Sequence, residues 1–354
     1  MKTITASAPG KLHLLGEHVV VYGNHALLTA ISKRCTTTVS EANEGITISF
    51  LDTHKHCHYS LESIYQKLKR QKTARTMYSE TGDTHVLKNM VNNPFDYLIL
   101  ILGEIITNMN RTTIPSIAIS IHSEIPVGSG MGSSAALAVS TIGAVTAFLG
   151  TSFEKSAINE IAHRCEQWIH GTPSGGDTTT CCEGGTVYFQ KKKNGKIDIE
   201  LLESDHASEH TPVCYILQTG KPLESTGDMV ALVKAYKEQH PNKFDTILQS
   251  QESLTQELRS AFIEHDVKKM YYCIKEGEIN LEKLMIVSDK ARECIHAIEE
   301  SGGSAKISGA GGIKIGSGIV LAFHSDDNRI HTIASKFKYP IQSIILGQRG
   351  LHYE

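Results

Sequence analysis

The chain has 354 residues, enough for two domains of ordinary size, and its 40% hydrophobic and 21% charged residues are typical of a globular protein. Its formal net charge is −3, so no basic excess points to nucleic acid or to an anionic membrane surface as a partner. No apolar run is long enough to span a bilayer, and residues 1–11 contain no apolar signal core, which predicts a cytoplasmic chain.

The eight cysteines and eighteen histidines form no recognisable metal or redox motif. Neither a Cys-x-x-Cys pair nor a His-Glu-x-x-His helix occurs in the sequence. We therefore expect reduced thiols that pack as small hydrophobic side chains.

Short strands are predicted through the first third of the chain. Residues 4–7, 36–40, 46–51 and 117–121 carry β-branched side chains at a period of two. Residues 94–106 favour a buried helix before the last of these strands. The basic run at 67–75 lies in a polar stretch, and we expect a solvated face or a mobile loop there.

Two helices and a second group of strands follow. Residues 133–149 are apolar nearly all round and stop before Gly150, which predicts a central buried helix. Thr151 and Glu154 have the spacing of a capping box for a further helix that ends at Gly171. Strand patterns return at 186–190, 197–202 and 213–217.

The last third is mainly helical by its pattern. From about residue 225 to 301 apolar residues recur at intervals of three and four, and a strand follows at 318–323. Strands and helices in separate runs favour an α+β architecture over alternating βαβ units. We place a domain boundary after residue 190, which gives an N-terminal domain over 1–190 and a C-terminal domain over 191–354.

The segment I-P-V-G-S-G-M-G-S-S-A-A at 125–136 has three glycines within five residues. Glycines let the backbone approach a ligand closely, and the helix that follows directs its positive end to the same point. Such a loop can cradle a phosphate, although it can also be a structural connection, and it lacks the Walker A pattern. Its two final hydroxyls could cap the helix, ligate Mg²⁺ or divide these tasks. The candidate phosphate-binding residues are Gly128, Ser129, Gly130, Met131, Gly132, Ser133 and Ser134.

Two other segments hold charged residues beside turns. A-P-G-K-L-H-L-L-G-E-H at 8–18 supplies Lys11, Glu17 and His18, and E-Q-W-I-H-G-T-P-S-G-G-D at 166–177 supplies Glu166 and Asp177. Taken singly, each has an ordinary structural interpretation. Lys11 would be solvated, Glu166 would lie on a solvated helix face, and Asp177 would cap a helix.

These three segments in this order, followed by K-I-S-G-A-G-G at 306–312, resemble the GHMP kinases. That family includes galactokinase, homoserine kinase, mevalonate kinase and phosphomevalonate kinase. The resemblance runs from residue 8 to about 320, and the order and spacing of four motifs make it specific. It implies an ATP-dependent kinase for a small alcohol, with an N-terminal domain like domain 2 of ribosomal protein S5, a C-terminal ferredoxin-like domain and an active site in the cleft between them.

Within the family, G-E-H-V-V-V-Y-G at 16–23 is similar to the mevalonate kinases, whereas galactokinases continue Gly-Glu-His with Thr-Asp-Tyr. The resemblance implies mevalonate as the acceptor in isoprenoid precursor synthesis, with ATP and Mg²⁺ as the other small molecules. We expect no nucleic-acid or membrane partner, and a homodimer is left open. A sugar or phosphomevalonate as acceptor, or a non-catalytic ligand-binding relative, are the alternatives.

The same resemblance assigns roles to single residues. It implies that Lys11 and Asp177 are catalytic, that Glu17 and His18 contact the acceptor together with Asp177, and that the Mg²⁺ ligands are Ser134 and Glu166. Phosphoryl transfer requires mainly positioning and charge stabilisation. Asp177 can act as a general base, or Lys11 can stabilise the developing charge while Asp177 orients the alcohol. A lysine neighbour makes Asp177 a weaker base, which favours shared roles.

The sequence departs from the family pattern in two places. G-A-G-G-I-K-I-G-S-G at 309–318 is about two residues longer than the usual glycine motif, with Lys314 inserted. Mevalonate kinases often carry an arginine just before a Ser/Asn-Thr pair after the mid-chain strand. Here T-G-K-P-L-E-S-T at 219–226 has Lys221 as its basic residue. Both departures bear on the shape of the acceptor site.

Overall fold

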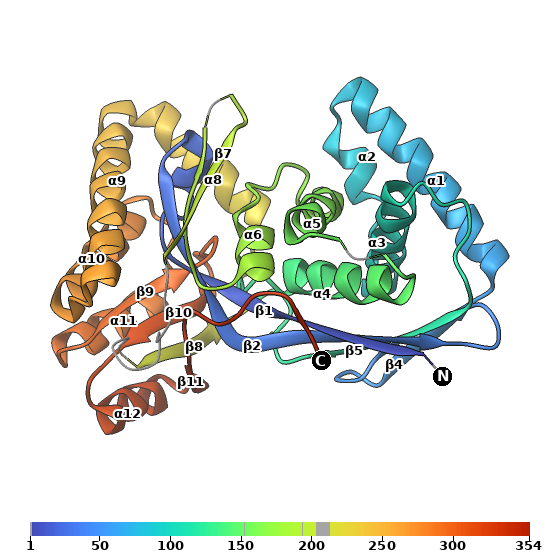
Figure 1. The fold of residues 1–354 in the computed structure, drawn as a ribbon. Coiled ribbons are helices and arrows are strands. Elements are labelled where there is room, and N and C mark those ends of the chain that lie inside the picture. Colours follow the sequence, from blue (N-terminus) through green and yellow to red (C-terminus); the bar gives the residue numbers. More distant parts are fainter. Residues whose placement is uncertain (1, 152, 193, 203–212) are drawn as a thin grey trace.

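The computed structural model describes residues 2–151, 153–192, 194–202 and 213–354. Their strands form two sheets, and helices pack on both (Figure 1). The first sheet has the order β12-β1-β2-β5-β3-β4, and β6 pairs with another part of β2 while β7 pairs with β6. All neighbouring strands are antiparallel except β3 and β5, which are parallel. Its strands are β1 (Thr3–Leu15), β2 (His25–Glu41), β3 (Ile46–Phe50), β4 (Lys55–Tyr59), β5 (Ile117–Ser123), β6 (Thr186–Lys191), β7 (Ile197–Leu202) and β12 (His352–Tyr353).

Helices cover one face of this sheet. α4 packs directly on β1 and β2 and is buried almost all round, as its apolar composition predicts (Figure 1). Its small alanines and glycine let it approach the strands closely. The helices of this part are α1 (Leu61–Thr81), α2 (Thr84–Lys88), α3 (Pro94–Asn108), α4 (Ser133–Phe148), α5 (Lys155–His170) and α6 (Gly176–Glu183), and the short 3₁₀ helix η1 (Val19–Tyr22) follows β1.

The second sheet is antiparallel, with the order β11-β8-β10-β9. An antiparallel sheet whose strands and helices come in separate runs of the chain agrees with the predicted α+β architecture. Its strands are β8 (Cys214–Gly220), β9 (Ser304–Ser308), β10 (Gly318–Phe323) and β11 (Ile341–Ile344). The helices of this half are α8 (Thr226–Gln239), α9 (Pro241–Glu264), α10 (Val267–Lys283), α11 (Asp289–Glu300) and α12 (Asp327–Phe337).

The two sheets share a core. One hydrophobic cluster contains residues of β1 and α4 together with residues of α9, α10, β8 and β10. Polar contacts add to this junction, because Asn24 donates to the Leu248 carbonyl at 2.8 Å and His25 Nδ1 lies 2.6 Å from Glu252 Oε1. The end of β1 and the turn after it are therefore fixed from both sides.

The sheets do not divide at residue 190. β7 follows that residue and pairs with β6, and β12 returns from the end of the chain to pair with β1. The first sheet thus contains residues from both sides of the predicted boundary. The division into two domains near residue 190 stays a prediction.

One local prediction needs correction, and another is confirmed in one of its two forms. The predicted capping box at Thr151 is wrong, because Thr151 N–H still donates to the Thr146 carbonyl at the end of α4. α5 begins later, with Glu154 as its N-cap and no side-chain cap bond. The basic run at 67–75 lies on α1 and forms a partly solvated helix face, which confirms the first of the two predicted forms, a solvated face or a mobile loop.

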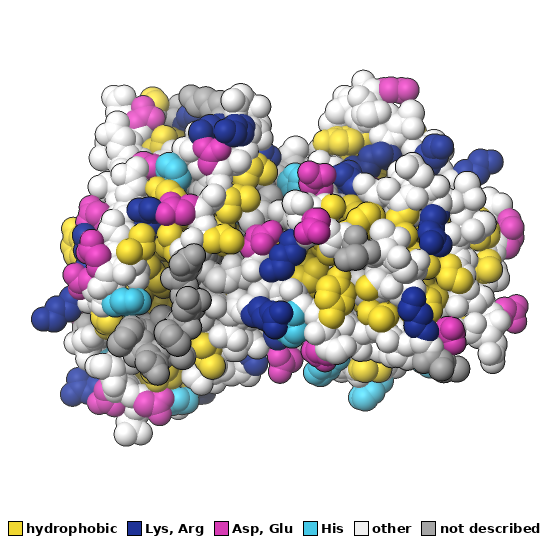
Figure 2. All heavy atoms as spheres, viewed as in Figure 1, with side chains coloured by type: hydrophobic (Ala, Val, Ile, Leu, Met, Phe, Trp, Pro, Cys, Tyr) yellow, Lys and Arg dark blue, Asp and Glu magenta, His cyan; other side chains and the backbone are white. Residues whose placement is uncertain are grey.

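On the face seen in Figure 2, acidic and basic side chains are interspersed over both halves of the molecule. Within the described part of the chain, no helix combines the length and the apolar character needed to cross a bilayer.

Candidate functional site

Lys11 lies on β1 beside the glycine-rich loop. The register of β1 against β2 shifts at Gly10, and Lys11 N–H leaves the ladder to donate to the Met131 carbonyl at 3.0 Å. Its side chain is only 3% exposed, so the interpretation as a solvated lysine is wrong. Lys11 Nζ lies 3.1 Å from Asp177 Oδ2 and 3.1 Å from His13 Nδ1. The fold therefore brings the two predicted catalytic residues into direct contact.

Asp177 is the second residue of α6. The N-cap of this helix is Gly175, with φ of 99°, and no side chain caps it. Asp177 is thus not the cap, and its carboxylate pairs with Lys11 while remaining partly open to solvent. A carboxylate in the first turn is also favoured by the helix dipole.

His13 was not among the predicted site residues. An ammonium group only donates, so His13 Nδ1 accepts the hydrogen bond from Lys11. Burial, and next the neighbouring Lys11 charge, hold the pKa of His13 well below its usual value of 6.5, so the ring is neutral near pH 7. Residues two apart on a strand share a face, so the spacing of His13 from Lys11 was the available signal.

The glycine-rich loop has the geometry of a phosphate cradle. Gly128, Gly130 and Gly132 have φ values of 75°, 82° and 71°, a region that residues with a Cβ rarely adopt. Gly132 is the N-cap of α4, and no side chain caps the helix, so neither Ser133 nor Ser134 takes that role. The first N–H groups of α4 therefore have no intrahelical partner and can bind an anion.

This loop is packed against Lys11 and against the second half of the molecule. A Cβ added at Gly132 would lie 2.9 Å from Lys11 Cγ, and one at Gly130 would lie 3.0 Å from the Ser308 carbonyl oxygen. Ser129 Oγ donates to the Pro126 carbonyl at 2.7 Å and holds the start of the loop. The close packing explains why glycine occupies these positions.

Glu166 is buried on α5, with 2% of its side chain exposed, so the interpretation as a solvated helix face is wrong. Tyr97 donates to Oε1 at 2.8 Å, Ser134 donates to Oε2 at 3.1 Å, and His170 Nε2 lies 3.3 Å from Oε2. Burial by itself raises the pKa of Glu166. The contacts with His170, Tyr97 and Ser134 lower this pKa by more than burial raises it, so the net pKa is below its usual value and the carboxylate stays ionised. Tyr97 and His170 were not predicted.

The predicted Mg²⁺ ligands are therefore adjacent. A hydroxyl and an ionised carboxylate are hard oxygen donors, which suit Mg²⁺. Among the described residues, no group of three or more His, Cys, Asp and Glu side chains could enclose a metal ion. This donor set fits an ion that takes its other ligands from phosphate oxygens and water.

Glu17 and His18 lie in the turn between β1 and η1 and contact the second sheet. Glu17 forms an ion pair with Lys306 of β9, and both side chains are buried. His18 has φ of 60°, and its Nε2 lies 3.0 Å from the Ala310 carbonyl oxygen. Burial is the main cause that lowers the pKa of His18 to about 4, so the ring is neutral.

The long glycine segment at 309–318 combines a buried start with an exposed bend. Gly309 packs on the phosphate loop, with its Cβ position 3.5 Å from Gly130 Cα. The inserted Lys314 and its neighbours Ile313 and Ile315 are exposed. The extra length is therefore accommodated at the surface, and the part that meets the phosphate loop is kept.

Lys221, in the other departing segment, approaches the same loop. Its Cε lies 3.8 Å from the Cβ position of Gly128. A cation is therefore present beside the cradle, although it comes from a different position than the arginine often found in mevalonate kinases.

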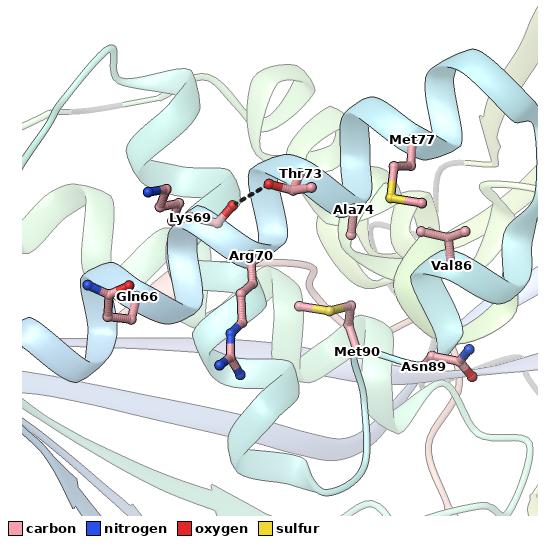
Figure 3. A pocket seen from close by; sticks show the side chains of 9 residues that line it. All are labelled: Gln66, Lys69, Arg70, Thr73, Ala74, Met77, Val86, Asn89 and Met90. Atoms are coloured by element: carbon pink, nitrogen blue, oxygen red, sulfur yellow. Dashed lines mark hydrogen bonds between the residues drawn. The ribbon is translucent and has the colours of Figure 1, made fainter.

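A groove of about 580 Å³ lies elsewhere, between α1 and α2. Figure 3 shows the side chains that line it, among them the apolar Met77, Val86 and Met90 and the cationic Arg70. It contains none of the predicted site residues, so we treat it as separate from the candidate active site.

Two family models match the chain. The model of the N-terminal domain of GHMP kinases matches residues 99–185, and the galactokinase galactose-binding signature matches residues 1–41. The first match contains the phosphate loop, Ser134, Glu166 and Asp177, and the second contains Lys11, Glu17 and His18.

The chain is also similar over most of its length to individual proteins. It is 31% identical over 329 residues to the mevalonate kinase of Thermococcus gammatolerans, which covers 87% of this chain and 86% of that protein. It is 28% identical over 307 residues to the mevalonate kinase of Archaeoglobus fulgidus, which covers 87% of this chain and 89% of that protein.

Solved structures of GHMP kinases confirm the predicted α+β fold over nearly the whole chain. The mevalonate kinase of Methanococcus jannaschii superposes with a TM-score of 0.78 at 20% identity, covering 98% of this chain and 99% of that one. The galactokinase of Lactococcus lactis, in complex with galactose, superposes with a TM-score of 0.73 at 15% identity, covering 99% and 95%. At these sequence identities the similarity establishes the fold and does not identify the acceptor.

Proposed function

The chain belongs to the GHMP kinase family and is an ATP-dependent phosphotransferase with an alcohol acceptor, and we propose that it phosphorylates (R)-mevalonate to 5-phosphomevalonate. The observation that carries the proposal is the Lys11–Asp177 ion pair at 3.1 Å, packed against the phosphate loop. Lys11 supplies a positive charge and Asp177 supplies a proton acceptor at the point where a phosphoryl group and an alcohol would meet.

The nucleotide phosphates would bind to the N-terminus of α4. The uncapped N–H groups and the helix dipole both favour negative charge at Gly132 and Ser133. Bound to Ser134 and Glu166, Mg²⁺ would neutralise part of the phosphate charge. To bind the ion, Glu166 would give up its present contacts with Ser134 and His170.

Lys11 is held ready for the transfer. Its ammonium has three N–H donors, and among the described residues one reaches Asp177 and one reaches His13. The third remains for an oxygen of the transferring phosphoryl group. Because Lys11 is fixed before the reaction, it can stabilise developing charge without reorganising.

Asp177 would receive the acceptor's hydroxyl. Its carboxylate pairs with Lys11 through Oδ2 and is partly open to solvent, so we assign the acceptor's hydroxyl to its other oxygen, Oδ1. That oxygen can accept the hydroxyl hydrogen bond, orient the attacking oxygen and take its proton as the P–O bond forms. We propose that Lys11 and Asp177 share the activation of the alcohol.

Glu17 and His18 would recognise hydroxyl groups of the acceptor. A carbonyl only accepts, so His18 Nε2 carries the proton toward Ala310, and Nδ1 is left as an acceptor in the neutral ring. Glu17 Oε2 is buried and has no hydrogen-bond partner among the described residues. Two hydrogen-bond acceptors on consecutive residues suit a molecule with hydroxyl donors, such as mevalonate.

Galactose is the second candidate, because the galactose-binding signature matches residues 1–41. The motif here continues G-E-H-V-V-V where galactokinases have Thr-Asp-Tyr after Gly-Glu-His, which favours mevalonate. We further propose Mg²⁺ as the metal and the cytoplasm as the compartment. The homodimer stays a prediction.

The test is ADP release by the purified chain with ATP and Mg²⁺, offered (R)-mevalonate, galactose or phosphomevalonate, with a control that lacks acceptor. We expect turnover above the control with mevalonate. An Asp177→Asn variant, assayed in parallel, shows that the activity belongs to this site. Turnover of galactose or phosphomevalonate with mevalonate inert would replace the proposed acceptor.

A further inference from the structure

Lys306 is a fully buried cation that no part of the proposed mechanism uses. It lies on β9 with none of its side chain exposed, and its Nζ contacts Glu17 Oε1 and donates to the Ile307 carbonyl. Glu17 belongs to the other half of the molecule, 289 residues earlier in the chain. The ion pair therefore joins the acceptor motif to the second sheet.

A second buried carboxyl, that of Glu278 on α10, lies near this pair. Glu278 Oε2 accepts the Ile307 N–H at 3.0 Å. Burial raises the pKa of Glu278 well above its usual value of 4.5, although Lys306 and the Ile307 N–H oppose the shift. Glu17 is the carboxyl group whose oxygen contacts Lys306 Nζ directly.

The same strand and loop hold the acceptor motif at two further points. Ser308 exchanges hydrogen bonds with the backbone of His13, at 3.2 and 3.3 Å, and the Ala310 carbonyl contacts His18. Lys306, Ser308 and Ala310 thus follow the motif over its length. A buried ion pair is often no more stabilising than packed apolar side chains, but it fixes the direction of each charge.

We propose that Lys306 is a positioning residue for the acceptor. It holds Glu17 through Oε1 and so directs Oε2, which has no partner among the described residues, at an acceptor hydroxyl. This inference rests on the proposed function, in which Glu17 binds the acceptor. Because none of its side chain is exposed, Lys306 itself would touch neither the nucleotide nor the reacting atoms.

The test is a cycle of Glu17→Gln, Lys306→Met and the double variant, with KM measured for acceptor and for ATP. Misplacing a binding group by an ångström can cost about 100-fold, so we expect Lys306→Met to lower kcat/KM for the acceptor by that order while the KM for ATP changes little. In the Glu17→Gln background, Lys306→Met should add little further loss, because its effect passes through Glu17. Lys306→Arg keeps a donor and a charge and should recover part of the loss.

Two controls separate positioning from folding. Lys275→Met removes a partly exposed lysine from α10, paired with Glu299 at 3.3 Å, and should leave both KM values unchanged. Lys306→Met leaves a buried carboxylate unpaired and can fail to fold. The double variant has no unpaired carboxylate at position 17. If Lys306→Met does not fold, the kcat/KM of the double variant for the acceptor is compared with that of Glu17→Gln. Equal acceptor kcat/KM supports the proposal, and a large further loss overturns it.

The outcomes also distinguish this inference from the proposed function. If wild type uses another acceptor, the cycle is measured with that acceptor. A normal acceptor KM in Glu17→Gln contradicts the role of Glu17 in the proposed function. A raised acceptor KM in Glu17→Gln beside unchanged kinetics in a folded Lys306→Met variant overturns only the inference about Lys306.

Discussion

Lys11 and Asp177 contribute in different ways to the same step, and single variants separate them. Asp177→Asn removes the charge and the proton acceptor at nearly constant size, and we expect kcat to fall by about 10²–10⁴-fold with ATP binding little changed. Lys11→Met should also lower kcat, because it removes charge stabilisation that is strongest in the transition state. Steady-state kinetics of both variants measure the losses.

The double variant tests whether the pair acts as one unit. Because Lys11 Nζ and Asp177 Oδ2 are 3.1 Å apart, its loss should be much smaller than the product of the single losses. Circular dichroism confirms that each variant folds. Near-normal kcat in Asp177→Asn would remove Asp177 from the mechanism.

Ser134 and Glu166 should act through the metal. Ser134→Ala and Glu166→Gln each remove or weaken an oxygen ligand, so we expect both to need more Mg²⁺ for half-maximal rate, with the mevalonate KM little changed. Titration of Mg²⁺ against rate gives the comparison, and Ser133→Ala serves as the matched control. If neither variant alters the metal requirement while Ser133→Ala does, Ser133 is the ligand.

Glu278 should make stability depend on pH. Its pKa in the folded chain is raised, so the folded state keeps a proton that the unfolded chain has lost above about pH 4.5. Its contribution is complete below that pH and is lost as the pH rises toward the folded pKa, at about 1.4 kcal/mol per pH unit. Glu278→Gln cannot ionise and retains an acceptor for Ile307 N–H, so its stability relative to wild type should increase from pH 5 to pH 7.

Urea unfolding at the two pH values measures this difference. Glu293→Gln, the same exchange at an exposed position of α11, is the control and should show no such trend. A difference between Glu278→Gln and wild type that stays constant with pH would mean that Glu278 is ionised in the folded chain.

At the scale of elements, the phosphate loop depends on conformation and on space together. Gly132→Ala and Gly150→Ala both place a Cβ on a residue with positive φ, at 71° and 80°, which costs about 1–2 kcal/mol in each case. A Cβ at Gly132 also meets Lys11 Cγ at 2.9 Å, whereas one at Gly150 meets nothing within 4 Å. We expect Gly132→Ala alone to raise the KM for ATP and lower kcat.

Thermal unfolding of the two variants provides the control for strain. Similar losses of stability with unequal losses of activity would support the cradle. If Gly150→Ala lowers activity as much as Gly132→Ala does, the effect is general destabilisation and the loop has no special role.

At the scale of the whole molecule, the shared core predicts cooperative unfolding. One hydrophobic cluster joins β1 and α4 to α9, α10 and β10, so neither half can expose its surface without the other. The single tryptophan, Trp168, is buried in α5 and reports on the first half, while far-UV circular dichroism reports on all helices. The two urea transitions should coincide, and separate midpoints would show that the halves unfold independently.

The sequence by itself determined the elements and motifs whose signal is local. Gly128, Gly130 and Gly132 were identified by spacing alone, because positive φ selects glycine wherever the chain turns in that way. The helix over α4 and most strands follow from side-chain periodicity, which depends only on near neighbours. Motif order then carried the family resemblance and, through it, the fold.

The tertiary structure alone decided which charged residues are buried and what each one meets. Lys11, Glu166 and Glu17 have the local pattern of solvated side chains, and only the packing of distant segments encloses them beside Asp177, Ser134 and Lys306. Tyr97 contacts Glu166 from a distant helix and was missed for the same reason, whereas His13 and His170 lie two and four residues from Lys11 and Glu166, so that local spacing could have indicated them. A charge can be buried only where a partner is supplied, and that partner comes from far along the chain, where periodicity gives no information.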